Sequence, residues 1–157
     1  MNFHKIESTN LSNGLGWRVI LWVSGCTHHC KGCHNPETWD YNSGKVFTSK
    51  ELHSILNFMC KSYIKGLTLS GGDPLAPDNR EEILNIVRIV KTEFPEKDIW
   101  LYTGYKYEEI KDLEILDYID VVVDGEFIQE QRDITLPFRG STNQRIIELR
   151  KPDDSKS

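Results

Sequence analysis

The sequence predicts an α/β protein with an open, mostly parallel sheet, folded as a single domain over residues 1–157. Short runs of β-branched and aromatic residues alternate with segments whose apolar residues recur at helical spacing, which is typical of βαβ units. The chain of 157 residues has room for five or six strands, whereas a complete (β/α)8 barrel takes about 250 residues. We therefore expect a partial, open (β/α) barrel.

The first elements are set by turn signals and by apolar spacing. A β-branched and aromatic run at 18–24 predicts a buried first strand. The polar segment before it is either an edge hairpin or a loop that approaches the site. The capping box at 48–51 begins a helix, and Cys60 beside its apolar face is expected to be an ordinary buried or half-buried thiol rather than a metal ligand. The apolar face of this helix carries Leu52, Ile55, Leu56 and Met59.

The rest of the chain continues the alternation of strand and helix. We expect strands at 67–70, 98–102, 119–123 and 146–149, helices at about 78–95 and 107–116, and a frayed charged tail at 151–157. Ligands of open parallel sheets bind at the carboxyl ends of the strands. Four segments follow predicted strand ends and should converge on one edge of the sheet: 26–33, 71–73, 103–105 and 124–125.

Composition and charge restrict the partners and the location. The formal net charge is -5 and no stripe of Lys and Arg is present, so we expect no nucleic-acid partner. No apolar run approaches the roughly 20 residues of a membrane span, and no signal peptide opens the chain, so we expect no membrane partner. The expected location is the cytoplasm, where thiols stay reduced.

Three of the four cysteines lie in one turn-rich loop, residues 24–36, directly after the first predicted strand. Cys26, Cys30 and Cys33 have the spacing C-x3-C-x2-C, and an odd number of thiols indicates a metal site rather than disulfides. Structural zinc would need a histidine as its fourth ligand. A [4Fe-4S] cluster held by three cysteines instead leaves one iron open. The spacing favours iron–sulfur, a zinc-binding interaction module stays the alternative, and His28 and His29 are expected to be solvated loop residues.

A second glycine-containing segment follows the next predicted strand. Gly71 and Gly72 precede Asp73, and glycines at a strand end let a ligand approach the backbone closely. A tight strand-to-helix turn explains the same pair without a ligand. The position of this segment beside the cysteine loop favours a role in binding.

The cysteine motif after a first strand resembles the signature of the radical S-adenosylmethionine (SAM) superfamily. The resemblance implies a radical SAM type of partial barrel, with a [4Fe-4S] cluster on Cys26, Cys30 and Cys33 and SAM on the open iron. It implies an oxidoreductase that cleaves SAM reductively to methionine and a 5′-deoxyadenosyl radical, with no catalytic side chain because the cluster and SAM carry the chemistry. The residues implied to contact SAM are Gly32, Cys33, His34, Gly71, Gly72, Asp73 and Thr103. The chain departs from the usual pattern at two of them: many relatives have an aromatic residue at the position of Gly32, and many have Glu at the position of Asp73.

Further segments resemble one family within that superfamily, the activating proteins of anaerobic (class III) ribonucleoside-triphosphate reductases. The distinguishing segments are Val123-Asp124-Gly125 and Arg139-Gly140-Ser141-x-Asn143-Gln144-Arg145. The resemblance implies that a glycyl radical is installed on the large subunit of the reductase, with reduced flavodoxin or a similar electron donor. Activation of another glycyl-radical enzyme, or radical SAM chemistry on a small molecule, is the alternative. We expect the loop 139–145 either to dock the partner or to cap the barrel.

Overall fold

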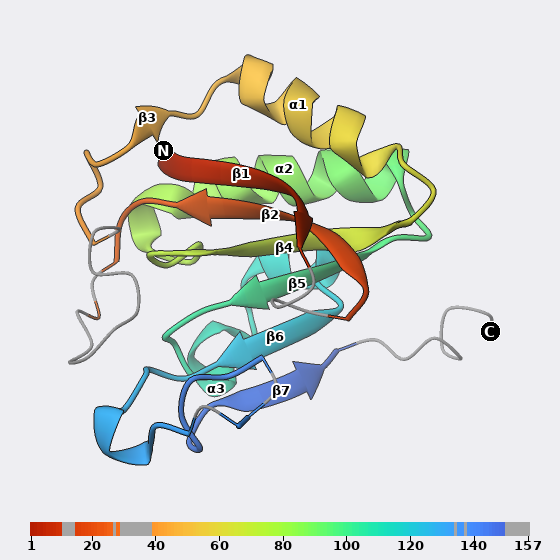
Figure 1. The fold of residues 1–157 in the computed structure, drawn as a ribbon. Coiled ribbons are helices and arrows are strands. Elements are labelled where there is room, and N and C mark those ends of the chain that lie inside the picture. The colour runs from red at the N-terminus through yellow and green to blue at the C-terminus, as the bar shows by residue number, and fades with distance from the viewer. Residues whose placement is uncertain (11–14, 27, 29–38, 134, 137, 150–157) are drawn as a thin grey trace.

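The computed structural model describes residues 1–10, 15–26, 28, 39–133, 135–136 and 138–149. These residues contain one mixed sheet with the strand order β3-β1-β2-β4-β5-β6-β7 (Figure 1). β3 and β7 lie at opposite ends of this order, so the described sheet is open, and the predicted α/β class is confirmed. The four central strands are parallel: β2 (Trp17–Val23), β4 (Ile64–Gly71), β5 (Asp98–Tyr102) and β6 (Val121–Asp124). The flanking strands are antiparallel to their neighbours: β1 (Asn2–Asn10), β3 (Lys45–Val46) and β7 (Arg145–Glu148).

The helices lie on one face of this sheet; in Figure 1 α2 and α3 are seen behind the strands, and α1 lies above them. The two long ones are α1 (Ser49–Met59) and α2 (Arg80–Glu93). Their apolar sides pack on alternate residues of the parallel strands and form the main core, because successive strand residues point to opposite faces. No helix within the described part of the chain is long and apolar enough to cross a membrane. Core residues include Val19, Leu21, Leu67, Leu69, Ile99 and Leu101 from the strands, and Ile55, Met59, Ile83, Ile86, Val87 and Val90 from the helices.

α1 begins where the sequence predicts, with Thr48 as its N-cap, although the Thr48 hydroxyl accepts from Lys50 and not from Glu51 as a capping box requires. The Thr48 hydroxyl accepts a hydrogen bond from the Lys50 N–H at 3.3 Å and donates one to the Glu51 carboxylate at 3.0 Å. Side-chain caps of this kind satisfy backbone donors that have no partner within the helix. The second predicted helix is also present, although a 3-10 turn, η2 (Pro77–Asn79), precedes it.

The prediction of one helix at 107–116 is wrong. The chain forms a short α3 (Tyr107–Ile110), followed by a 3-10 segment, η3 (Glu114–Tyr118). Leu113 between them is extended, with φ −71° and ψ 134°, and packs against the core together with Ile115 and Leu116. Burial of these apolar side chains therefore outweighs the continuation of the helix.

The N-terminal segment, for which the sequence left two alternatives, forms a hairpin with the first parallel strand. β1 pairs with β2 from Phe3 opposite Val23 to Asn10 opposite Arg18. It is not the edge, because β3 pairs with its outer side. β3 was not predicted, since two residues inside a polar stretch are too few to show a period.

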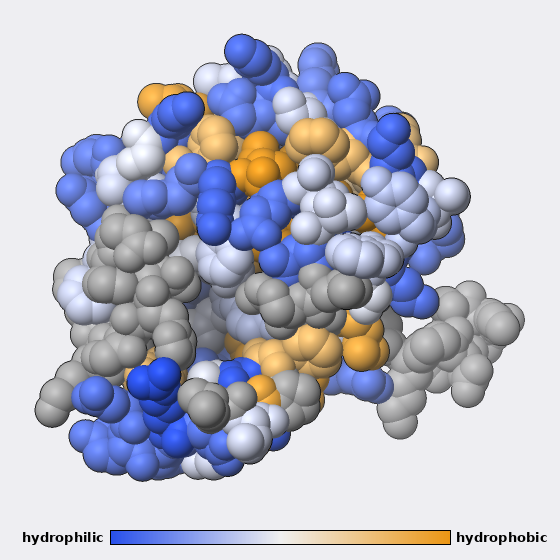
Figure 2. Space-filling model, viewed as in Figure 1, coloured by the Kyte–Doolittle hydropathy of each residue, from blue (hydrophilic) through white to orange (hydrophobic). Residues whose placement is uncertain are grey.

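The opposite face of the sheet faces the viewer in Figures 1 and 2, and no helix of the described residues covers it. A recess lies near the middle of this face, and hydrophobic surface borders it toward β6 and β7 (Figure 2). Near the start of β2 the fully buried Arg18 donates to the Thr68 hydroxyl at 2.7 Å and to the Leu67 carbonyl at 2.9 Å. Its guanidinium also lies 2.6 Å from Asp98 at the start of β5. Arg18 thus connects β2, β4 and β5 at their amino ends.

We expect Gly71→Ala to destabilise the protein more than Gly125→Ala. Both glycines have positive φ, +112° and +95°, which costs an L residue roughly 1–3 kcal/mol. A Cβ on Gly71 would also lie 2.4 Å from the Val23 backbone, whereas one on Gly125 would lie 3.6 Å from Asn143 Nδ2. Urea unfolding should show a loss of about 1 kcal/mol for Gly125→Ala and at least twice that for Gly71→Ala. Equal losses would contradict a packing role for Gly71.

Candidate functional site

The structure brings the carboxyl ends of the parallel strands together. The Gly72 N–H donates to the Val23 carbonyl at 2.9 Å, and the Asp73 N–H donates to the Gly25 carbonyl at 2.7 Å, which connects the ends of β4 and β2. Beyond β6, the Gly125 N–H donates to the Tyr105 carbonyl at 3.0 Å. The predicted convergence of these segments on one edge is therefore present. We call this edge, with the segments that follow β2, β4, β5 and β6, the carboxyl rim.

The cysteine loop starts from this rim. Cys26 is buried directly after β2, and its N–H donates to the Trp39 carbonyl at 3.1 Å, so the loop closes at its base. The predicted ligands Cys30 and Cys33 lie outside the described residues, as do Gly32 and His34. Their roles stay predictions. A buried thiol at the mouth of a closed loop, with two further cysteines within that loop, fits a thiolate-held cluster at the rim.

Asp73 is the most highly connected side chain of the rim. It is fully buried, and its carboxylate accepts hydrogen bonds from the Leu75 N–H and the Gly104 N–H, both at 2.9 Å. The Thr103 hydroxyl lies 2.9 and 3.0 Å from its two oxygens. Asp73 therefore holds the end of β4 against the end of β5. The polar side-chain atoms of Asp73 and Thr103, both predicted to contact SAM, are engaged within the protein.

His28 contradicts its prediction as a solvated loop residue. Its side chain is only 11% exposed, its Nε2 lies 2.8 Å from Asp73 Oδ2, and its Nδ1 lies 3.4 Å from Glu126 Oε2. The contact with Asp73 raises the pKa of His28, against the opposing effect of burial, and the charge of Glu126 also raises it. The imidazole ring meets Tyr105 edge-on, with ring centroids 4.6 Å apart. Spacing along the chain gave no signal for these partners.

Glycines shape this part of the rim for packing. A Cβ on Gly104 would lie 2.6 Å from the His28 ring, and one on Gly25 would lie 2.3 Å from the Tyr41 ring. Gly71 is likewise required by the close approach of β4 to β2. These glycines let segments of the protein pack closely against one another. The contact of Gly71 with a ligand stays a prediction.

A second network connects β6, α3 and β7. The buried Asp124 accepts from the Tyr107 N–H at 2.7 Å and from Arg145 Nε at 3.1 Å. Arg145 also lies 2.8 Å from Glu108, and its side chain is about half exposed. In the sequence, Asp124 and the loop 139–145 form two separate motifs. In the structure they belong to one network, because Arg145 of the loop contacts Asp124.

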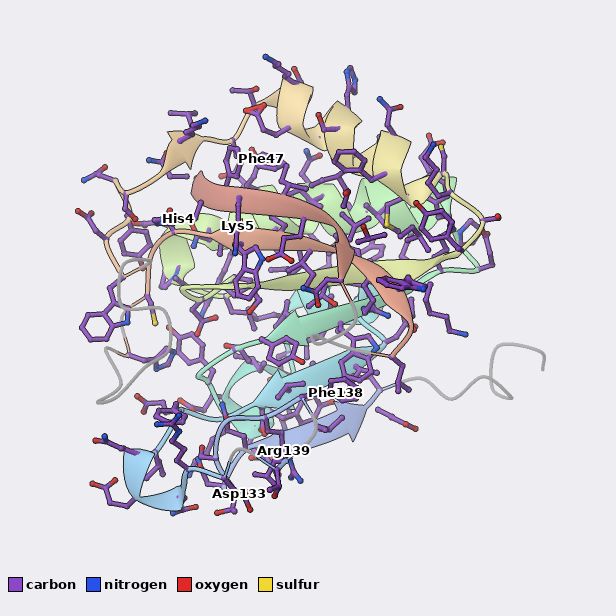
Figure 3. The ribbon with its side chains drawn as sticks, in the orientation of Figure 1. His4, Lys5, Phe47, Asp133, Phe138 and Arg139 are labelled. Carbon is purple, nitrogen blue, oxygen red and sulfur yellow. The ribbon has the colours of Figure 1, made fainter. Side chains whose placement is uncertain are left out.

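The loop before β7 packs on the helix-free face. Phe138, labelled in Figure 3 with Asp133 and Arg139, has a positive φ of 61° and meets the Trp100 ring edge-on at 5.2 Å. Arg139 donates to the Gln144 carbonyl at 3.0 Å. Gln144 in turn donates to the Gly125 carbonyl at 3.0 Å. The loop is therefore held against the segment that follows β6.

Two adjoining grooves open beside the cysteine loop. The larger, of about 530 Å³, is bounded by His28, Gly104, Glu126 and Asn143 among others. The smaller, of about 330 Å³, shares Lys106, Ile128 and Asn143 with it. The grooves therefore run from the cysteine loop along the segment after β6 toward Arg145.

Cys60 lies at the other end of the molecule. It follows α1 and precedes β4, while Cys26 follows β2, and these two strands are parallel. The two thiols are therefore at opposite edges of the sheet, which excludes Cys60 as a fourth ligand. Cys60 is exposed, so the expectation of a buried or half-buried thiol is wrong.

Comparison with known proteins identifies relatives over nearly the whole chain. Residues 12–147 match the family model described as a 4Fe-4S single cluster domain. The chain is 51% identical over 146 residues to the anaerobic ribonucleoside-triphosphate reductase-activating protein of Enterobacteria phage T4, covering 93% of each chain. Proteins of the same name match from Vibrio cholerae, at 49% identity over 93% of this chain and 97% of the relative, and from Escherichia coli K12, at 45% over 96% and 100%.

We expect Asp73→Asn to destabilise the protein, because an amide NH2 would face donors that now share the carboxylate. Leaving buried donors without an acceptor costs roughly 1–3 kcal/mol for each group. Asp78→Asn is the matched control, since Asp78 is exposed in the next turn and should change stability by less than about 0.5 kcal/mol. Urea unfolding of the metal-free proteins measures both. Equal effects of the two substitutions would remove Asp73 as the centre of the rim.

Proposed function

Because the chain belongs to the family of anaerobic ribonucleoside-triphosphate reductase-activating proteins, we propose that it activates such a reductase by generating a glycyl radical on its large subunit. The single observation that carries this is the identity of 51% over 93% of the chain with a protein of that name. The relatives are named for a ribonucleotide reductase, which favours this reading over activation of another glycyl-radical enzyme and over a small-molecule substrate.

We expect Cys26, Cys30 and Cys33 to hold a [4Fe-4S] cluster. The match to a 4Fe-4S single cluster domain favours this over the zinc alternative. Three thiolates leave one iron of the cube without a protein ligand, and SAM would bind there. When bound, the cluster supplies one electron for the cleavage of SAM to methionine and a 5′-deoxyadenosyl radical, which removes a Cα hydrogen from a glycine of the reductase. A cytoplasmic location and reduced flavodoxin or a similar donor agree with this chemistry.

The described residues support the SAM site mainly through the backbone. The Asp73 carboxylate accepts a hydrogen bond from the Thr103 hydroxyl, so we expect these two side chains to position the ends of β4 and β5. The amino acid end of SAM is expected against the backbone of Gly71 and Gly72. The predicted contacts of Gly32, Cys33 and His34 belong to the part of the cysteine loop outside the described residues and stay predictions.

The partner is expected to approach the helix-free face and the carboxyl rim. An open sheet leaves this side accessible, so a glycine loop of the reductase can close the site itself. Many polar groups of the loop 139–145 bond within the loop or to the segment 124–126, which favours a capping role for most of it. The half-exposed Arg145 beside the smaller groove is the part best suited to docking.

Substitution of any one loop cysteine should abolish cluster binding. Cys26→Ala, Cys30→Ala and Cys33→Ala each remove one of three thiolates, so the anaerobically reconstituted proteins should lose the brown absorbance and the ability to cleave SAM. Cys60→Ala is the matched control, because Cys60 lies at the opposite edge of the sheet, and it should keep both. Normal iron content in any loop variant would refute the assigned ligands.

The proposed reaction predicts an electron paramagnetic resonance signal. The reconstituted and reduced protein, mixed with SAM and the large subunit of an anaerobic ribonucleoside-triphosphate reductase, should produce a glycyl doublet. Omission of SAM, or the use of Cys33→Ala, should remove it. A protein that carries about four irons and cleaves SAM, yet yields no doublet with any such reductase, would refute the proposed substrate.

A further inference from the structure

His28 is the described residue of the cysteine loop that reaches across the carboxyl rim. It lies two residues after Cys26, and its two ring nitrogens face carboxylates from two different segments, Asp73 after β4 and Glu126 after β6. A loop side chain with 11% exposure between two such partners is held from both sides. The cysteine loop is thereby connected to strands other than the one from which it starts.

The surrounding residues are shaped to receive this ring. Gly104 leaves the space that the ring fills, since a Cβ there would lie within 2.6 Å of it. The Tyr105 ring packs edge-on against the imidazole, and the Arg80 guanidinium lies 5.5 Å from the centre of the same Tyr105 ring. Asp73, whose carboxylate lies 2.8 Å from His28 Nε2, is itself fixed by Thr103 and Gly104. The position of His28 is therefore determined by several elements together.

The second partner of His28 belongs to the surface on which a protein would dock. Glu126 and His28 both line the larger groove, and the Glu126 carbonyl accepts from the Asn143 side chain at 2.8 Å. Contacts thus run from the loop 139–145 through Glu126 to His28, which lies two residues after Cys26 in the sequence. A protein bound in the groove would affect the position of the cysteine loop through Glu126 and His28.

We propose that His28 is a positioning residue, which fixes the cysteine loop to β4 and β5 through Asp73 and to the docking groove through Glu126. The inference rests on the proposed function, because it concerns how the cluster is aligned with a docked protein substrate. His28 would thereby hold the described start of the loop against the groove that is proposed to receive the reductase. Loss of this connection should separate cleavage of SAM from formation of the glycyl radical.

Four variants distinguish this role from a general effect on folding. His28→Gln places an amide N–H near the position of Nε2 and keeps a donor for Asp73, whereas His28→Asn places one near Nδ1 and keeps a donor only for Glu126. Glu126→Gln leaves His28 in place and removes the charge at the groove. His53→Gln is the control, because His53 is exposed on α1.

The first measurement is hydrogen exchange of backbone amides in the reconstituted full-length proteins without SAM. Loss of the Asp73 contact in His28→Asn should speed exchange at residues 24–28 by about tenfold, the effect expected when one charge-assisted hydrogen bond is removed. His28→Gln should restore most of the protection. Exchange in His28→Asn equal to that of the wild type would overturn the proposed connection.

The second measurement is the number of SAM molecules cleaved for each glycyl radical formed. We expect this ratio to rise about tenfold in His28→Asn and severalfold in Glu126→Gln, with unchanged iron content in Glu126→Gln. An unchanged ratio in both Glu126→Gln and His28→Gln would overturn the link to the docking groove. If the wild type itself gives no doublet, the proposed function fails, while the exchange measurement still decides whether His28 fixes the loop.

Discussion

The carboxyl rim depends on one buried carboxylate, that of Asp73. A carboxylate removed from water is costly unless donors surround it. Asp73 accepts hydrogen bonds from Leu75 in its own turn and from Gly104 at the end of β5, and His28 of the cysteine loop lies 2.8 Å from its carboxylate. Because each donor comes from a different segment, the carboxylate is satisfied only when these segments meet. The rim is therefore held in one arrangement by the requirement to pair a single charge.

The same three strands are connected again at their amino ends. Arg18 of β2 bonds Thr68 of β4 and faces Asp98 of β5, and like Asp73 it is fully buried. A buried cation at one end and a buried anion at the other thus fix β2, β4 and β5 on opposite edges of the sheet. Removing one partner of a buried charge costs more than the pair itself contributes, so neither end tolerates partial pairing. Arg18 and Asp73 thus hold the same three strands together at their two ends.

The sequence predicted the features that depend on nearby residues, such as strand ranges and helix caps. It missed the features that depend on contacts between residues far apart in the chain. β5 agrees with its predicted range, 98–102, and Thr48 caps α1, because apolar period and capping chemistry are local. The sequence predicts a solvated His28 because its partners Asp73 and Glu126 lie far away in the chain. The helix at 107–116 was interrupted because Leu113 reaches the core, which no local propensity reveals. The open sheet could be predicted from chain length, whereas the residues that hold its rim could not.

The short segment after β6 makes two sets of contacts, one with α3 and β7 and the other with His28 of the cysteine loop. Asp124 fixes α3 and β7 through Tyr107 and Arg145, and two residues later Glu126 contacts His28. Gly125 between them has a φ of +95°, which L side chains rarely adopt. A shift of this segment would move the docking grooves and the cysteine loop together, because the same backbone carries both contacts. In the proposed reaction, this segment would align the protein substrate with the cluster, with no need for a deep pocket in the chain itself.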